Sequence, residues 1–223
     1  MSDQTVRRNT RALEPALITD PIELAKAEAR NGLRQTDAGV QAQTAIERGG
    51  FKLRPSLICS LHREALNGLS SYAGIFRPGG VEIGKSKHEP PPAHLVPELV
   101  EKLYDYVNDH WEGCTALHLA AYVMWRLNWI HPFADGNGRT SRTVSYVILS
   151  VRAGYVPSGA PAIPNQIVQN RTPYFEALEA AVEAERPRFK QDGKPLGNAA
   201  RTAIEGFFRK CWRQTAVRPV TVH

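Results

Sequence analysis

One polar stretch of the chain combines residue types that could carry out chemistry on a phosphate. Residues 131–142, HPFADGNGRTSR, contain a histidine, an aspartate, two glycines around an asparagine, and two arginines. Apolar flanks on both sides predict a loop held between two buried helices. Glycines let a backbone turn tightly and approach a ligand closely. The N–H groups of Gly136, Asn137 and Gly138 could therefore bind an anion at the start of the second helix.

Two arginines follow this turn. Arg139 and Arg142 lie three residues apart on the first turn of the expected helix, and they therefore project to the same side. Their forked donors match phosphate oxygens. Two cations at a helix N-terminus oppose the helix dipole unless an anion lies between them, so the pattern favours a bound phosphate over a purely structural role.

An acid and a base flank the expected phosphate site. Asp135 precedes the glycine turn, and Mg²⁺ usually takes one or two carboxylates together with substrate phosphates. His131 ends the preceding helix and could accept a proton from a hydroxyl whose oxygen attacks phosphorus. Each residue alone also fits a capping, turn or core role. Together they supply what phosphoryl or nucleotidyl transfer requires.

Helical periodicity predicts the elements that must position these residues. The expected helices cover residues 20–47, 54–69, 96–111, 115–130 and 174–185, a further helix runs from the Gly-Asn-Gly turn through residue 151, and residues 204–211 mark a last helix. The helix over residues 115–130 is apolar on most sides and should lie at the centre of a bundle. No change in composition indicates a second domain. We expect one domain over residues 19–215, after a mobile basic lead-in of residues 1–18 and before a tail of residues 216–223.

The least helical part of the chain predicts one small β-hairpin. Residues 74–77 and 81–83 are strand-like runs around Pro78, Gly79 and Gly80. This hairpin could be an ordinary surface ribbon or a part of the functional site. The expected fold class is therefore all-α, a helical bundle with one small β-hairpin.

Composition limits the class of protein. The chain of 223 residues is 42% hydrophobic and 22% charged, as a globular domain is, and its formal net charge of +6 suits an anionic partner or a solvated basic surface. Cys59, Cys114 and Cys211 are widely spaced and predict reduced thiols without a disulfide or metal site. With no apolar leader and no membrane-spanning run, we expect a cytoplasmic protein with no membrane partner.

Residues 131–142 match the HxFx(D/E)GNGRxxR motif of the Fic (filamentation induced by cyclic AMP, or Fido-domain) family at every specified position. The segments EARNGLRQ, LHREAL, YAGIFRPGGVEIG, HEPPPAHLVPELV and RTPYFEALEAA also resemble family segments, in the family's order. The chain therefore resembles this family over most of its length. The resemblance implies a Fic-type helical bundle with a β-hairpin flap, here residues 74–84.

The resemblance also implies an activity. A protein adenylyltransferase transfers AMP from ATP to a Ser, Thr or Tyr hydroxyl of a target protein and releases pyrophosphate. In this chain the resemblance implies that His131 is the base, that Asp135 binds Mg²⁺, and that the flap pairs with the target's backbone as an added strand. The Gly-Asn-Gly turn would hold the α and β phosphates, the first arginine would support the phosphate site, and the second would grip the γ phosphate. The implied nucleotide-binding residues are Gly136, Asn137, Gly138, Arg139 and Arg142.

Many relatives carry an inhibitory helix with the pattern (S/T)xxxE(G/N), whose glutamate pairs with the second arginine of the motif. This chain has no clean copy. Glu205 and Gly206 end such a pattern, but Arg201 stands where Ser or Thr is expected, and residues 19–23 have the spacing but are followed by Leu24. The protein is expected to be constitutively competent, to be restrained by a small antitoxin-like partner, or to use a degenerate inhibitory helix.

Other functions stay open on the sequence alone. A Fic-type enzyme could transfer another phosphate-bearing group, such as phosphate, UMP or phosphocholine, or could remove AMP. The non-enzymatic alternative is a nucleotide-binding module, although binding alone needs neither His131 nor Asp135. No helix-turn-helix or aromatic-basic RNA motif is present, so a nucleic-acid partner is not expected. The motif specifies neither the target nor the oligomeric state.

Overall fold

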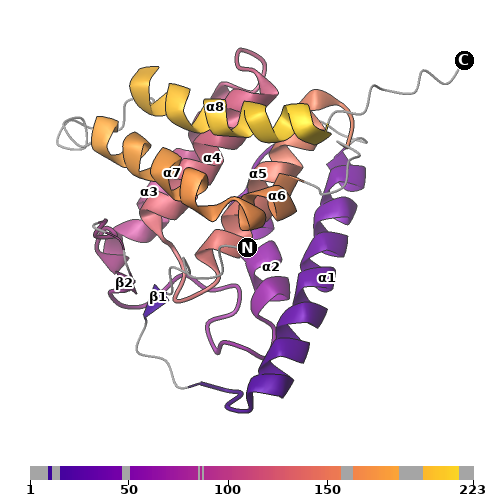
Figure 1. The fold of residues 1–223 in the computed structure, drawn as a ribbon, viewed down its shortest axis with the longest axis vertical. Coiled ribbons are helices and arrows are strands. Elements are labelled where there is room, and N and C mark those ends of the chain that lie inside the picture. The colour runs from indigo at the N-terminus through magenta and orange to yellow at the C-terminus, as the bar shows by residue number, and fades with distance from the viewer. Residues whose placement is uncertain are drawn as a thin grey trace, which may run out of the picture.

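Helices account for nearly all of the regular structure. The structure, a computed structural model, describes residues 10–11, 16–46, 51–84, 86, 88–156, 163–185 and 198–215. Its elements in chain order are β1 (Thr10–Arg11), α1 (Pro21–Ile46), α2 (Pro55–Leu66), β2 (Glu82–Ile83), η1 (Ala93–Leu95), α3 (Val96–Asp109), α4 (Ala116–Ile130), α5 (Asn137–Ala153), α6 (Ile163–Gln169), α7 (Arg171–Glu185) and α8 (Asn198–Thr215). The predicted all-α fold class is confirmed (Figure 1).

The first helix, α1, begins where the sequence predicts. The Asp20 carboxylate accepts hydrogen bonds from the N–H groups of Ile22 and Glu23, at 2.9 and 2.8 Å, and so caps the first turn. The helix runs along one side of the bundle and packs against α2 and α5 (Figure 1). The buried side-chain amides of Asn31 and Gln35 donate to backbone carbonyls in or just after α2, at 2.8 and 3.0 Å. These contacts fix α1 against the helix that will support the motif.

The central helix is α4, as its apolar sequence predicts. It packs against α3, α5, α7 and α8, and all of residues 118–127 are buried. The Thr115 hydroxyl caps its start by accepting a hydrogen bond from the His118 N–H at 3.2 Å. Because neighbours enclose α4, the position where it ends is well defined, and residues 131–142 begin at that end.

The helices α7 and α8 pair with each other, and both pack against α4 (Figure 1). Glu205 of α8 contacts His118 of α4, with Oε1 2.8 Å from Nδ1, and the Tyr106 hydroxyl of α3 lies 2.8 Å from Nε2 of the same histidine. The glutamate of the partial inhibitory pattern therefore has a structural partner inside the bundle.

The helices α6 and α7 differ from the sequence prediction. The helix α7 begins at Arg171, three residues before the expected start at Tyr174, because a proline in the first turn, here Pro173, removes no helical hydrogen bond. The short helix α6 was not predicted, since its seven residues are too few to show a clear period.

The predicted hairpin over residues 74–84 is wrong. In the described part of this segment, Glu82 and Ile83 are the residues in a strand, and residues 74–77 form turns and irregular backbone. The partner of β2 is β1, which runs antiparallel with Thr10 opposite Ile83 and Arg11 opposite Glu82. Two residues of the expected mobile lead-in are thus paired with the flap segment, as we call residues 74–84.

Hydrogen bonds to distant residues explain why no hairpin forms. The Gly74 N–H donates to His62 Nδ1 at 2.8 Å, and Gly74 itself has a left-handed φ of 81°. The Arg77 N–H donates to Pro132 O at 2.9 Å. These amides bind α2 and the loop after α4, so they are not available to a strand ladder.

Some sequence expectations lie outside the described residues: residues 1–9 and 12–15 of the lead-in, residue 47 at the end of the first expected helix, and the tail of residues 216–223. In the part of the chain that the structure describes, no helix combines the length and the apolarity needed to cross a membrane.

Candidate active site

The loop of residues 131–136 joins α4 to α5. His131 is the first residue after α4 and has a left-handed backbone, with φ 51° and ψ 58°. Its N–H still donates to Leu127 O at 2.9 Å, which completes the last helical turn. A left-handed backbone costs a residue with a Cβ about 1–2 kcal/mol, so contacts elsewhere must stabilise this conformation.

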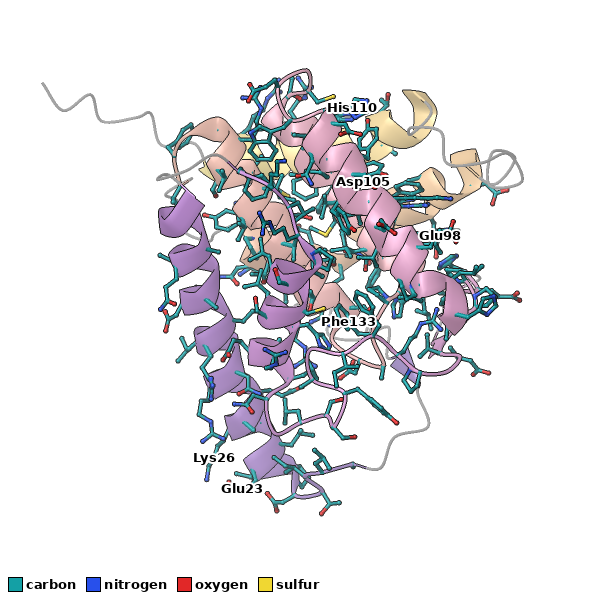
Figure 2. The ribbon with its side chains drawn as sticks, turned by 180° about the vertical axis from the view of Figure 1, so that it is seen from behind. Glu23, Lys26, Glu98, Asp105, His110 and Phe133 are labelled. Carbon is teal, nitrogen blue, oxygen red and sulfur yellow. The ribbon has the colours of Figure 1, made fainter. Side chains whose placement is uncertain are left out.

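Phe133 and Asn137 close the loop from inside. The Phe133 side chain is fully buried, and Figure 2 shows it in the interior among side chains of several helices. Its N–H donates to Asn137 Oδ1 at 2.9 Å, and Asn137 Nδ2 donates back to Phe133 O at 2.8 Å. The buried Asn137 side chain therefore shapes the loop, and its backbone N–H is the group that could meet a phosphate.

His62 of α2 holds the loop from outside. Its Nδ1 accepts the Gly74 N–H, so Nε2 carries the proton and donates to Asp135 O at 3.0 Å. Its ring stacks on Phe133, with centroids 3.7 Å apart and planes 5° from parallel. Burial lowers the pKa of His62 to about 4, so the ring is neutral at pH 7. Sequence reasoning did not name this residue; its only signal was the family-like segment LHREAL.

Gly136 lies where α5 meets α2. Its φ is 71°, and its carbonyl accepts the first hydrogen bond of α5, from the Thr140 N–H at 2.9 Å. A Cβ on Gly136 would lie 2.3 Å from Leu66 Cδ2. Both the backbone conformation and the close packing therefore require glycine here.

The start of α5 presents polar groups that could bind an anion. Within the described residues, the N–H groups of Asn137, Gly138 and Arg139 have no acceptor. The half-buried Arg142 side chain lies over Gly138, because a Cβ there would be 3.2 Å from its Nη1. Burial lowers the pKa of Arg142, and the nearby cations of Arg139 and Arg171 lower it further, whereas Tyr174 raises it. In the described chain no carboxylate forms an ion pair with Arg142, so the site has an excess of positive charge.

Arg139 differs from Arg142 because it has two acidic neighbours. Its Nη2 lies 3.1 Å from Asp135 Oδ2, and its Nη1 lies 3.4 Å from Glu28 Oε1 of α1. The side chains are partly exposed, and exposed ion pairs contribute at most about 1 kcal/mol. A phosphate could therefore displace either carboxylate. Glu28 was not named from the sequence, because it lies far from the motif along the chain.

Asp135 fits a substrate-bound Mg²⁺ better than a preformed metal cage. Its carboxylate is 53% exposed at the mouth of the loop. Among the described residues, no three His, Cys, Asp or Glu side chains come close enough to hold an ion by themselves. A single carboxylate beside a phosphate site is the donor set that Mg²⁺ uses with nucleotides.

His131 is buried and its tautomer is defined. Its Nδ1 lies 3.2 Å from Asn128 O, and because a carbonyl accepts, Nδ1 carries the proton and Nε2 is the nitrogen that can accept one. Burial lowers the pKa of His131 to about 4, partly opposed by the Asn128 carbonyl. The Asn128 side chain is itself held by Ser141 Oγ and the Tyr174 hydroxyl, at 2.8 and 3.1 Å from Nδ2. The imidazole is thus neutral at pH 7 and held by the end of α4, where the Asn128 side chain contacts α5 and α7.

Comparisons with known proteins find similarity to one protein family. Residues 52–149 match the sequence model of the Fic/DOC family. Two proteins named protein adenylyltransferase Fic, from Drosophila persimilis and Drosophila willistoni, are 35% and 36% identical to this chain over 130 and 132 residues, or 57% of this chain. The match spans 24% of each relative, so this chain corresponds to a minor part of their length.

Solved structures share the fold. A Fic domain containing signaling protein from Bacteroides thetaiotaomicron VPI-5482 superposes with a TM-score of 0.67 at 19% identity, covering 85% of this chain and 69% of that chain. A Fic family protein from Desulfovibrio desulfuricans G20 has a TM-score of 0.58 at 22% identity, covering 89% and 53%. The matched residues 52–149 include the complete motif in the loop between α4 and α5, so this part of the chain is similar to the Fic/DOC family, and the fold resembles solved Fic structures.

The close packing at Gly136 generates a stability prediction. Gly136→Ala adds a methyl group against Leu66 in a left-handed backbone, and we expect the free energy of unfolding to fall by about 3 kcal/mol. Gly154→Ala is the matched control, because Gly154 has a φ of 77° but no atom within 4 Å of its Cβ position, and should lose only about 1 kcal/mol. Urea denaturation of both variants measures the difference, and equal losses would contradict the packing argument.

The two buried neutral histidines predict a loss of stability in acid. Their folded pKa of about 4 lies below the ordinary value of 6.5, so between these limits the unfolded chain binds more protons. The stability from neutral His62 is complete above pH 6.5 and is lost as the pH falls toward 4. When the pH falls from 7 to 5, the free energy of unfolding of His62→Gln should therefore fall by roughly 1–2 kcal/mol less than that of the wild type.

Urea denaturation in EDTA at the two pH values measures this difference in slope. His94→Gln is the control, because His94 is exposed and outside the loop. If the unfolding free energy of His62→Gln falls between pH 7 and pH 5 as much as that of the wild type, His62 is not held neutral in the folded protein.

Proposed function

We propose that the protein is an adenylyltransferase that transfers AMP from ATP to a hydroxyl of a protein. The proposal rests on one observation. The same short loop carries a neutral imidazole of defined orientation and leads into a set of hydrogen-bond donors that could bind a phosphate. His131 offers Nε2 as a base, and the start of α5 offers backbone N–H groups and Arg142. The relatives named protein adenylyltransferase support the same activity.

In this mechanism, His131 Nε2 takes the proton of the target hydroxyl as its oxygen attacks the α phosphorus. A bond forms between that oxygen and phosphorus, and the bond from the α phosphorus to the bridging oxygen breaks. Pyrophosphate leaves and AMP stays on the target. The N–H groups of the Gly-Asn-Gly turn and the start of α5 bind the α and β phosphates, the Arg139 side chain supports them, and Arg142 binds the γ phosphate.

Asp135 would hold Mg²⁺ together with the phosphates. When bound, the ion neutralises charge on the phosphates and on the leaving pyrophosphate. The Asp135 carboxylate is exposed and lies 3.1 Å from Arg139 Nη2. Binding of Mg²⁺ would therefore exchange its ion pair with Arg139 for a contact with the metal ion.

The target is proposed to pair with the flap segment as an extended strand. The strand β2 supplies the backbone for this pairing, and β1 now pairs with it. Since β1 and β2 pair over only two residues each, the contact is short enough for another extended segment to replace it.

Labelled ATP tests the proposed reaction. With Mg²⁺ and cell lysate, we expect label on protein from α-labelled ATP and none from γ-labelled ATP. His131→Ala should reduce transfer at least about 100-fold, because the base is lost. Arg142→Ala should raise the Kd for ATP by about tenfold or more, because a charged hydrogen-bond donor is lost, and should change the unfolding free energy by less than about 1 kcal/mol.

Each other outcome points to an alternative. Label from the γ phosphate would indicate a kinase. ATP binding by the purified protein with no transfer would indicate a binding module. Unchanged ATP use in Arg142→Ala would contradict its assigned role.

Deletion of residues 1–15 tests the competition at β2. The deletion removes a few strand hydrogen bonds, worth about 1 kcal/mol in total. Transfer to lysate proteins at limiting concentration should therefore increase by about fivefold. The Kd for ATP should not change. A synthetic peptide of residues 5–15 added to the deleted protein should lower transfer again. Unchanged or reduced transfer in the deleted protein would show that β1 does not compete with targets.

A further inference from the structure

Arg77 is a buried arginine that joins three separate parts of the backbone. Only 3% of the residue is exposed. Its Nε donates to His131 O at 2.8 Å, Nη1 donates to Gly79 O at 2.8 Å, and Nη2 donates to Pro91 O. In the described chain no carboxylate forms an ion pair with it, and these three hydrogen-bond acceptors are all backbone carbonyl oxygens. Burying a cation in this way costs folding free energy, which indicates that the protein needs the geometry that this side chain holds.

The contact with His131 O bears directly on the candidate base. The direction of a carbonyl group sets ψ of its residue, and ψ of His131 is 58° in the unfavourable left-handed region. The Arg77 N–H also donates to the next carbonyl, that of Pro132, at 2.9 Å. Two consecutive carbonyls are therefore fixed by one residue of the flap segment, and this stabilises the backbone that aims the imidazole.

The end of α4 is a favourable place for this cation. The last carbonyls of a helix carry partial negative charge and lack helical partners. Arg77 binds just beyond this end, and the His88 ring supplies another donor, with Nε2 2.8 Å from Trp129 O. Arg77 precedes β2 in the chain and His88 follows it. Both side chains thus contact backbone carbonyls at the end of α4 that carries His131.

We propose that Arg77 is a positioning residue that couples the flap segment to the base, so that the backbone of residues 77–79 and the conformation of His131 are set together. The proposal rests on the role of His131 in the proposed function. It predicts that loss of the guanidinium slows transfer while leaving the phosphate site intact, because Arg77 contacts neither the start of α5 nor its arginines.

Arginine suits this role better than lysine. A guanidinium has a planar set of donors that reach carbonyls in three directions at once, whereas an ammonium is a compact charge on a flexible stem. Arg77→Lys can replace at most part of the contacts with His131, Gly79 and Pro91. A free guanidinium ion, however, could fill the space left by Arg77→Ala and restore the same donors.

Arg152 provides a matched control. It also donates to two backbone carbonyls, with Nε 2.6 Å from Trp111 O and Nη2 3.1 Å from Glu112 O, in the connection between α3 and α4. Arg152→Ala therefore removes the same kind of contact at a place away from the motif. A purely structural role would make the two alanine variants alike in activity.

The test compares Arg77→Ala, Arg77→Lys and Arg152→Ala with the wild type. We measure transfer from α-labelled ATP to lysate proteins over a range of ATP concentrations, the Kd for ATP, and the NMR signals of the His131 ring, assigned with His131→Ala. Arg77→Ala should lose about 30–100-fold in apparent kcat, as expected for a displaced catalytic group, with less than a threefold change in KM and Kd for ATP. Methylguanidinium should restore transfer and the wild-type ring signals to Arg77→Ala, and methylammonium should not. Arg152→Ala should keep wild-type kcat and show no rescue.

The outcomes separate the two proposals. Equal kcat in the two alanine variants, or ring signals in Arg77→Ala that match the wild type, would overturn the positioning role. A wild-type protein that binds ATP but transfers nothing would refute the proposed function, and the ring signals with and without methylguanidinium would still decide whether Arg77 positions His131. If Arg77→Ala does not fold, the Arg77→Lys variant serves for the same comparison, with reduced kcat and shifted ring signals expected.

Discussion

The structure of the site depends on one constraint: the loop between two buried helices must have every inward polar group satisfied. An unpaired backbone group in this interior would cost about 1–3 kcal/mol. The Asn137 side chain bonds to the N–H and carbonyl groups of Phe133. His62 donates to the Asp135 carbonyl, and Arg77 donates to the His131 carbonyl. The loop has a single conformation because its partners come from three different parts of the chain.

The same loop places two opposite helix ends side by side. The C-terminal end of α4 has excess carbonyls, and a buried arginine lies against it. The N-terminal end of α5 has excess N–H groups, and arginines gather there without enough carboxylates to balance them. The first end is satisfied within the chain, whereas the second is suited to an anion from outside. This asymmetry is the physical basis for a phosphate site next to an oriented imidazole.

The neutral state of the buried histidines belongs to this arrangement. His62 accepts from Gly74 through one nitrogen and donates to Asp135 through the other, which requires an uncharged ring. His131 donates to Asn128 through Nδ1 and is likewise neutral because it is buried. One ring shapes the loop and the other is the candidate base, and burial among packed side chains sets the charge of both.

The sequence by itself determined the local features. Periodic apolar residues predicted α1 to α5, α7 and α8, Asp20 predicted the start of α1, and the spacing from His131 to Arg142 predicted the loop and the helix start that could bind phosphate. The resemblance to the Fic family could also be recognised from that spacing.

Only the tertiary structure decided what surrounds the motif. His62, Arg77 and Glu28 contact the motif from 54 to 111 positions away in the chain, and no local pattern encodes such contacts. The hairpin prediction failed for the same reason: alternation in sequence indicates a strand, but the N–H groups of Gly74 and Arg77 bind an imidazole and a loop carbonyl instead. Local structure follows from near neighbours in the chain, whereas the choice of partner for a buried polar group follows from how the helices pack.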